Sequence, residues 1–130
     1  MPSEKILVVD DYEDNLKLIR VVLSKAGYEV RTATDAEDAL RSLGEFHPGL
    51  ILMDIQMPGM DGLELTRLLK SDGKTRALPI VALTAYSMKG DQERFLAAGC
   101  DGYIPKPINI PTFASEVRRY FVEQAEAPHL

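Results

Sequence analysis

The sequence predicts an α/β domain built on a doubly wound, five-stranded parallel sheet flanked by five helices. Four short apolar runs and a strand-like segment at residues 28–32 alternate with longer stretches in which apolar residues recur at helical spacing, which is the pattern of successive βαβ units. The runs are apolar throughout instead of alternating, as expected for strands that helices cover on both faces. The strand order 2-1-3-4-5 is one of the two common orders of such sheets, and we adopt it by analogy.

Four of the five expected strands are short apolar runs bounded by polar or turn-forming residues, and the second has strand character without being apolar throughout. They cover residues 6–9, 28–32, 50–53, 80–83 and 103–104. The first run stops at two aspartates, the third at Asp54 and the fourth at Thr84, and two prolines close the fifth. These four strands therefore have sharp ends in the sequence.

The five expected helices carry apolar residues three or four positions apart. Gly27 and Gly99 are expected to stop the first and fourth helices, and Gly44 the second. Residues 56–62, with one proline and two glycines, are expected to form a loop. The apolar stripes are Leu16, Ile19, Leu23 and Ala26; Ala36, Ala39, Leu40 and Leu43; Leu65, Leu68 and Leu69; Phe95, Leu96 and Ala98; and Phe113, Val117 and Tyr120 or Phe121.

Length and composition are those of one globular domain, with 130 residues of which 45% are hydrophobic and 27% charged. We expect residues 1–122 to fold as this domain and residues 123–130 to form a short polar tail. Fifteen basic and twenty acidic side chains give a net charge of −5, which argues against nucleic acid or an anionic membrane as a partner. The single cysteine, Cys100, excludes an internal disulfide and a cysteine-based zinc site.

The start of the sequence lacks the basic residues and the long apolar run of a signal peptide. No stretch reaches the roughly 18 apolar residues that a membrane-spanning helix needs. We therefore expect a soluble protein of the reducing cytoplasm.

Polar residues that follow different strands should converge at one edge of the sheet, where doubly wound folds bind their ligands. Asp10 and Asp11 follow the first strand, Asp54 the third, Thr84 the fourth and Lys106 the fifth. Three neighbouring carboxylates repel one another unless a cation neutralises them, and oxygen ligands with room for water suit Mg²⁺. A nearby ammonium and a hydroxyl are the groups that balance the oxygens of a transferred phosphoryl group.

Each of these residues also has an ordinary role when it is considered alone. The aspartate pair could cap a helix, Asp54 and Thr84 could stabilise turns, and Lys106 could be a solvated surface lysine. Their joint placement after four different strands favours a functional site.

With these residues at the ends of its expected strands, the sequence resembles the response-regulator receiver family, which belongs to the CheY-like superfamily. The resemblance covers about residues 5–121, and its motifs lie at residues 6–11, 52–62, 83–85 and 103–107. Residues 83–107 look most like stand-alone regulators of the cell-cycle (DivK-like) type and like receivers attached to hybrid histidine kinases. We expect a stand-alone regulator, because the sequence after residue 122 is short and has no DNA-binding pattern.

The resemblance implies a switch in a two-component system or phosphorelay. Asp54 would accept a phosphoryl group from a sensor histidine kinase or a histidine phosphotransfer protein. Asp10, Asp11, Asp54 and the backbone carbonyl of Gln56 would bind Mg²⁺, and Lys106 would pair with a phosphoryl oxygen. The protein would catalyse its own phosphorylation and dephosphorylation only, and would not otherwise be an enzyme.

The resemblance also assigns switch and timing residues. Thr84 and Tyr103 would change position together after phosphorylation, and Gln56 and Tyr86 would tune the lifetime of the phosphoaspartate. The downstream protein would bind to the face of the fourth helix, fifth strand and fifth helix, and the domain would be a monomer or a phosphorylation-dependent dimer.

The resemblance also implies roles for residues that shape the backbone near the site or leave the site accessible. The family often has a cis peptide bond before the residue that is Pro107 here. Gly62 and the pair Pro58-Gly59 would form the loop beside the acceptor, and the small Ala85 would leave the phosphoryl group accessible.

Other functions fit parts of the sequence. A phosphatase of the haloacid-dehalogenase type needs an acid two residues after its nucleophilic aspartate, where this chain has Gln56. Gly73-Lys74-Thr75 suggests a P-loop, but Leu68 replaces its first glycine. A flavodoxin would have a hydroxyl- and glycine-rich phosphate loop after the first strand, where this chain has aspartates. The remaining alternative is a binding module of the same fold that is never phosphorylated.

Overall fold

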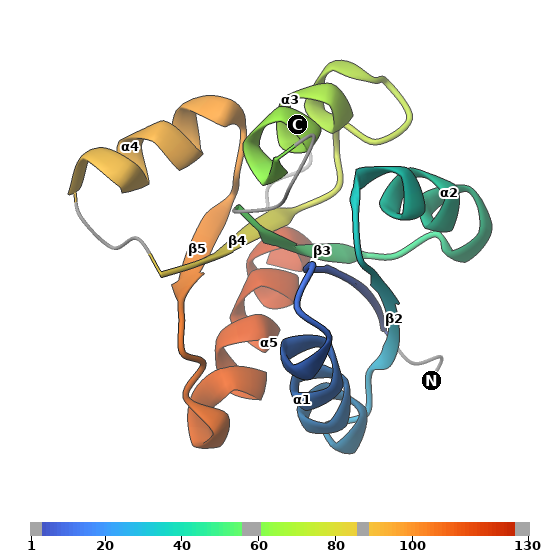
Figure 1. Ribbon diagram of the computed structural model, residues 1–130, viewed down its shortest axis with the longest axis vertical. Helices are drawn as coiled ribbons and strands as arrows, with labels where there is room; N and C mark the ends of the chain where they lie inside the picture. The colour runs from blue at the N-terminus through green and yellow to red at the C-terminus, as the bar shows by residue number, and fades with distance from the viewer. Residues whose placement is uncertain (1–3, 56–60, 86–88, 127–130) are drawn as a thin grey trace.

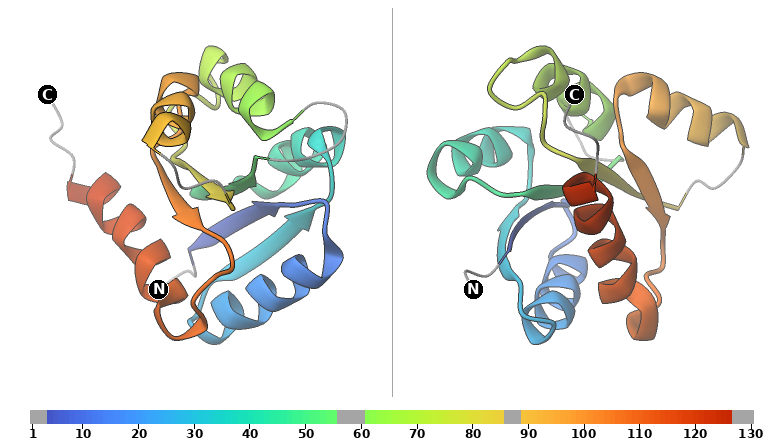
Figure 2. Two further views of the ribbon diagram at one scale, coloured as in Figure 1. Left: turned by 60° about the vertical axis from the view of Figure 1, so that its left-hand side comes forward. Right: turned by 180° about the vertical axis from the view of Figure 1, so that it is seen from behind.

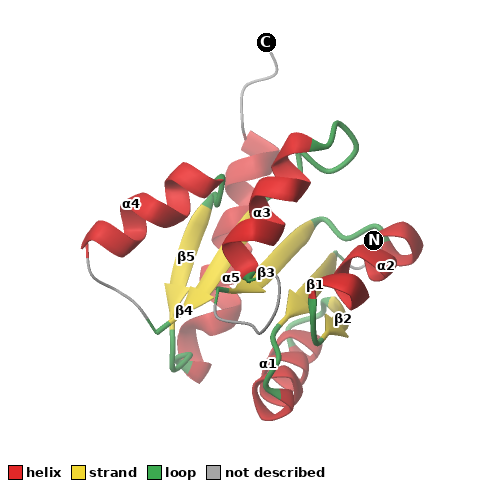
Figure 3. Ribbon diagram, turned by 45° about the horizontal axis from the view of Figure 1, so that its top comes forward, coloured by secondary structure: helices red, strands yellow, loops and turns green. Residues whose placement is uncertain are grey.

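Five parallel strands form the middle layer of the structure, a computed structural model that describes residues 4–55, 61–85 and 89–126 (Figure 1). Their order in the sheet is β2-β1-β3-β4-β5, which confirms the predicted order and fold class. Figure 3 shows the strands, in yellow, between two layers of helices. The strands are β1 (Lys5–Val9), β2 (Glu29–Ala33), β3 (Leu50–Asp54), β4 (Ile80–Thr84) and β5 (Gly102–Pro105).

Helices cover both faces of the sheet, two on one face and three on the other (Figure 2). Buried residues of α1 and α5 pack against one face, and those of α2, α3 and α4 against the opposite face. None of the described helices is long and apolar enough to cross a membrane. The helices are α1 (Glu13–Lys25), α2 (Ala36–Phe46), α3 (Gly62–Ser71), α4 (Lys89–Ala98) and α5 (Ile110–Glu126).

The alternation of side chains along each strand divides the core between the two faces. Leu7, Val9 and Met53 belong to the core cluster under α2, α3 and α4. Val8 and Leu52, their neighbours in sequence, belong to the cluster under α1 and α5. Both sets are buried, which explains why the central strands are apolar at every position.

Helix ends follow the signals in the sequence in most places. Asp35 caps α2 by accepting a hydrogen bond from the Asp38 backbone N–H, and Asp61 caps α3 in the same way from Glu64. Gly27, after α1, has the positive φ angle of 99° that favours glycine. The predicted stop of the first helix is therefore confirmed.

Some details differ from the sequence prediction. Gly44 lies inside α2, which continues to Phe46, and α5 continues to Glu126, so the expected boundary at residue 122 falls within a helix. The division into a domain and a polar tail stays a prediction. Three leucines assigned to apolar stripes are exposed, because only part of a helix surface can face the sheet: Leu40, Leu68 and Leu96.

Candidate functional site

The carboxyl ends of the strands bring the predicted site residues to one edge of the sheet. Asp54 is the last residue of β3 and Thr84 the last of β4, and the two strands pair with Asp54 opposite Leu83. Asp10 directly follows β1, and Lys106 directly follows β5. Side chains that are 96 positions apart in the sequence are therefore in contact.

Three carboxylates form the centre of the site. Ligand oxygens of Asp10, Asp11 and Asp54 all lie within 4.8 Å of one another. Asp10 and Asp54 are buried, whereas Asp11 is exposed. Three negative charges this close favour the binding of a cation, and a donor set made only of oxygen suits a hard divalent ion such as Mg²⁺. The residues present therefore fit the predicted metal.

The ammonium group of Lys106 lies between two of these carboxylates. Its Nζ is 3.1 Å from Asp10 Oδ2 and 3.2 Å from Asp54 Oδ1. Burial, the largest single effect, lowers the pKa of Lys106, but the charges and hydrogen bonds of Asp10 and Asp54 together raise that pKa above its ordinary value. The ammonium therefore stays charged and offsets part of the negative charge of the cluster.

Asp10 is fully buried and accepts hydrogen bonds on both carboxylate oxygens. The backbone N–H of Tyr12 donates to Oδ1 at 2.9 Å. Lys106 and the side-chain amide of Asn15 both donate to Oδ2, the amide at 3.4 Å. Asn15 was missed by the sequence analysis, although an asparagine five residues after Asp10, in the first turn of the next helix, was a usable signal.

The two predicted switch residues lie on neighbouring strands of the sheet, Thr84 on β4 and Tyr103 on the edge strand β5. The Thr84 side chain is buried at the end of β4. Tyr103, on β5, is partly buried and packs against the core cluster under α2, α3 and α4. Ala82 of β4 pairs with Tyr103, and Thr84 pairs with Pro105.

The structure describes some of the remaining predicted residues around the site, and others lie outside the described ranges. The peptide bond between Lys106 and Pro107 is cis, as predicted. Gly62 is buried at the start of α3, and its N–H donates to the Ile55 carbonyl oxygen. Ala85 is exposed. The predicted residues that lie outside the described ranges are Gln56, Tyr86 and the pair Pro58-Gly59.

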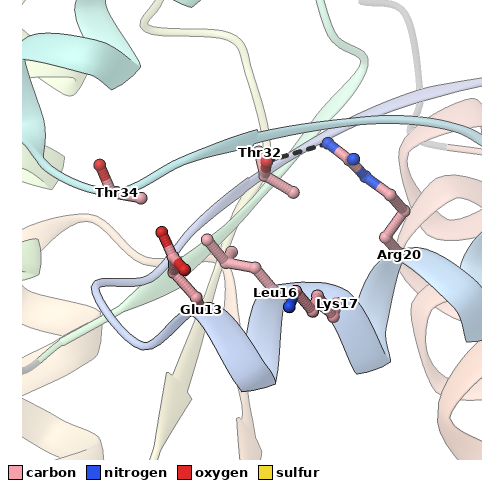
Figure 4. A pocket seen from close by; sticks show the side chains of 6 residues that line it. All are labelled: Glu13, Leu16, Lys17, Arg20, Thr32 and Thr34. Atoms are coloured by element: carbon pink, nitrogen blue, oxygen red, sulfur yellow. Dashed lines mark hydrogen bonds between the residues drawn. The ribbon is translucent and has the colours of Figure 1, made fainter.

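A separate pocket of about 230 Å³ lies between α1 and β2 (Figure 4). Arg20 crosses from α1 and donates a hydrogen bond to Thr32 Oγ1 at 3.0 Å. Among the described residues that line this pocket, none is a predicted site residue, so the pocket is separate from the carboxylate cluster. The lining residues are Glu13, Leu16, Lys17, Arg20, Thr32 and Thr34.

Two solved structures with similar sequences share this fold. The chemotaxis protein CheY4 of Vibrio cholerae has a TM-score of 0.85 and 30% identity, over 91% of this chain and 98% of that one. The receiver domain of a sensor histidine kinase from Pseudomonas aeruginosa has a TM-score of 0.83 and 33% identity, over 93% of this chain and 99% of that one. The latter structure contains a magnesium ion coordinated in its active-site cleft.

Sequence relatives cover nearly the whole chain. The polar-differentiation response regulator DivK of Brucella ovis is 43% identical over 118 residues, which is 91% of this chain and 96% of DivK. DivK of Brucella anthropi is 43% identical over 120 residues, 92% of this chain and 97% of that protein. Residues 6–118 match the family described as the response regulator receiver domain. The predicted resemblance is therefore confirmed, and the chain belongs to the family of response regulator receiver domains.

Proposed function

We propose that Asp54 is the phosphoacceptor of this receiver domain and that its phosphorylation requires Mg²⁺. The observation that carries the proposal is the contact of Lys106 with both Asp10 and Asp54 inside the cluster of carboxylates. Buried carboxylates at a strand end, with a lysine beside them, are a costly arrangement that a stable fold does not need. A site for a phosphoryl group and a divalent cation accounts for all of these charges.

The phosphoryl donor is a histidine kinase or a histidine phosphotransfer protein. A carboxylate oxygen of Asp54 attacks phosphorus while the bond from phosphorus to the donor's histidine nitrogen breaks, and the leaving imidazole takes a proton from solvent. Such a transfer depends mainly on positioning and on neutralisation of charge. The domain therefore needs neither a general base nor a second nucleophile.

The residues that would hold Mg²⁺ are Asp10, Asp11, Asp54 and, through its backbone carbonyl, Gln56, and Asp10 would act largely through water. Bound there, Mg²⁺ neutralises the carboxylates and the oxygens of the incoming phosphoryl group. Lys106 then turns from the carboxylates to a phosphoryl oxygen. Its raised pKa supports this role, because the ammonium is charged throughout the physiological pH range.

Thr84 and Tyr103 convert phosphorylation into a change of shape. The Thr84 hydroxyl moves to donate a hydrogen bond to the phosphoryl group, and Tyr103 turns inward into the space that Thr84 leaves. The buried position of Thr84 and the partial burial of Tyr103 support this assignment. Phosphorylation shifts the balance between two existing states, because it adds contacts in only one of them.

Gln56 and Tyr86 set the lifetime of the phosphoaspartate, with Tyr86 shielding the phosphoryl group from water. The decay of phosphorylated Tyr86→Ala, followed beside that of the wild type, tests this role. We expect faster decay in the variant, and equal decay rates would contradict the assignment.

The downstream partner binds to the face formed by α4, β5 and α5, and the domain acts in the cytoplasm as a monomer or a phosphorylation-dependent dimer. Leu96 of α4 is 57% exposed, and a groove of about 300 Å³ lies between β5 and α5. Tyr103, Arg119 and Tyr120 line the groove, so a rotation of Tyr103 would change its shape.

The experiment that tests the proposal is the intact mass of the protein after incubation with acetyl phosphate and Mg²⁺. We expect the addition of one phosphoryl group, and no addition to Asp54→Asn or in the presence of a metal chelator. Asp91→Asn, which removes a carboxylate on α4, is the matched control and should be phosphorylated like the wild type. Labelling of Asp54→Asn would contradict the assignment of the acceptor. A folded wild type that is never labelled would favour the phosphorylation-independent binding module.

A further inference from the structure

We propose that Asn15 is a positioning residue that holds the Asp10 carboxylate in place when Lys106 leaves it. The inference rests on the proposed function, because it concerns the state in which Mg²⁺ and a phosphoryl group occupy the site. It starts from the Asp10 Oδ2 atom, which accepts hydrogen bonds from both Lys106 and Asn15. The two donors differ in charge, and this difference determines which of them can remain.

When Mg²⁺ and a phosphoryl group occupy the site, Lys106 cannot keep its hydrogen bond to Asp10. Its ammonium is shared between Asp10 and Asp54, at nearly equal distances. A divalent cation held by the same carboxylates repels the ammonium, and a phosphoryl group on Asp54 attracts it. Asp10 is 0% exposed, so losing this donor would leave Oδ2 of a buried carboxylate with less support.

Asn15 is suited to replace this support because its amide is a neutral donor. The cation repels a neutral donor, and the phosphoryl group attracts it, much less strongly than either acts on a charged ammonium. The residue lies in the first turn of α1, so the helix backbone holds it in place while the groups around the phosphoryl site move. Together with the Tyr12 N–H on Oδ1, it keeps Asp10 turned towards the cation.

Helix stability does not explain an asparagine at this position. Asn15 lies inside α1, where asparagine is a poorer helix former than leucine. The N-cap position of this helix belongs to Tyr12, which makes no capping hydrogen bond with its side chain. A leucine at position 15 would therefore favour the helix. The hydrogen bond to Asp10 is the reason we infer for a polar side chain at this position.

The test separates the stability of the metal-free protein from the part that Mg²⁺ adds. Mg²⁺ affinity is measured by titration calorimetry, and the Tm is measured in chelator and at a fixed, subsaturating Mg²⁺ concentration, for wild type, Asn15→Leu, Asn15→Gln and the control Ser24→Leu. Ser24 is an exposed residue of α1 near the opposite end of the helix. The control makes the same polar-to-leucine change on the same helix.

For Asn15→Leu we expect Mg²⁺ affinity about three- to tenfold below wild type, the effect of losing one long hydrogen bond to a charged group. The Tm in chelator should be unchanged or higher, and the rise in Tm at a fixed, subsaturating Mg²⁺ concentration should be smaller. Asn15→Gln, which keeps an amide donor, should recover part of the affinity, and Ser24→Leu should bind Mg²⁺ like wild type.

Three outcomes would overturn the inference. Asn15→Leu could bind Mg²⁺ as tightly as wild type, or it could lose the same Tm in chelator and in Mg²⁺, which is the signature of a purely structural residue. Asn15→Gln could bind as weakly as Asn15→Leu, which would show that the amide donor is not the cause. By contrast, a wild type that binds no Mg²⁺ would contradict the proposed function itself, so the two failures are distinguishable.

Discussion

A Cβ atom on Gly62 would lie 2.1 Å from the carbonyl oxygen of Asp54. The backbone at the start of α3 thus passes directly over the backbone of the proposed acceptor, and the Gly62 N–H donates to the carbonyl of Ile55 next to it. Backbone atoms cannot yield as the end of a side chain can. Gly62 therefore sets how closely α3 approaches Asp54.

Replacing Gly62 with alanine should destabilise the protein. We expect the free energy of unfolding of Gly62→Ala to fall by about 1–3 kcal/mol, as in other overpacked sites, because the new methyl group displaces the Asp54 backbone. Phosphorylation by acetyl phosphate should also be slower. Urea denaturation and the rate of phosphorylation measure the two effects.

Gly44→Ala is the matched control, since Gly44 lies inside α2 and a Cβ there meets no other atom within 4 Å. Its free energy of unfolding should rise by about 0.5–1 kcal/mol, because alanine is the better helix former. A Gly62→Ala protein as stable as wild type would show that the close approach to Asp54 is relieved without cost.

Removing the charge of Lys106 should expose the repulsion within the carboxylate cluster. In chelator, we expect the free energy of unfolding of Lys106→Met to fall by about 1–3 kcal/mol, less than for a fully buried ion pair because the lysine side chain is 21% exposed. Saturating Mg²⁺ should reduce the difference from wild type, because the cation then neutralises the carboxylates. Lys74→Met, at an exposed lysine, is the control. An equal loss with and without Mg²⁺ would contradict this explanation.

Because the pKa of Lys106 is raised in the folded protein, the contribution of its ammonium to the free energy of unfolding should depend on pH. Burial lowers this pKa, and Asp10 and Asp54 raise it by more, so the folded protein binds the proton more tightly than the unfolded chain. The stability that the Lys106 ammonium contributes is therefore fully present below the ordinary pKa of 10.5, and it is lost as the pH rises through the higher folded pKa. The difference in free energy of unfolding between wild type and Lys106→Met should be constant around neutral pH and shrink above 10.5. A difference that grew with pH would have the wrong sign.

Lys70 should stabilise the amino-terminal ends of β4 and β5, which lie at the opposite end of the strands from the site. Its Nζ donates to the Leu78 carbonyl at 2.7 Å and to Asp101 Oδ2 at 3.0 Å, and Asp101 also accepts from the Ile80 N–H. Lys70→Met should lower the free energy of unfolding by about 1–3 kcal/mol, because polar groups lose a charged donor. Denaturation in urea measures the loss, and the exposed Lys74→Met should change stability little. Similar effects of the two variants would contradict a special role for Lys70.

Cys100 should be unreactive in the folded protein. Its side chain is 4% exposed, and burial, the largest effect on it, raises the pKa of the thiol. Iodoacetamide should label it slowly under native conditions and fully in denaturant, which mass spectrometry follows. Ser24→Cys supplies an exposed thiol in the same molecule and should react at once. Equal rates at the two positions would show that Cys100 is accessible.

Much of the fold and the main site residues could be predicted from the sequence because their signals are local. The strands β1, β3 and β4 contain apolar runs that stop at a polar residue, and the expected strand at residues 28–32 differs from the observed β2 by a single position. Asp10, Asp54 and Thr84 lie at strand ends, which parallel pairing brings to the same edge. The chemistry expected of these three residues follows from their residue types and from their shared position at that edge of the sheet.

The exposed leucines show where local signals stop being sufficient. Leu96 follows Phe95 directly, and adjacent residues of a helix point about 100° apart, so burial of one does not require burial of the other. Phe95 is buried and Leu96 is 57% exposed. The spacing identified the helix, but the position of the neighbouring helices and strands determined which residue is covered.

The sequence by itself therefore determined the order of the elements, the class of fold and the kind of chemistry at the strand ends, since these depend on residue type and spacing along the chain. Only the tertiary structure decided that Lys106 is shared by Asp10 and Asp54, that Asn15 supports the same Asp10 oxygen and that Gly62 touches the Asp54 backbone. The physical reason is that hydrogen bonds and steric contacts act over a few ångströms. The distances between atoms on different elements are set by the packing of the whole core.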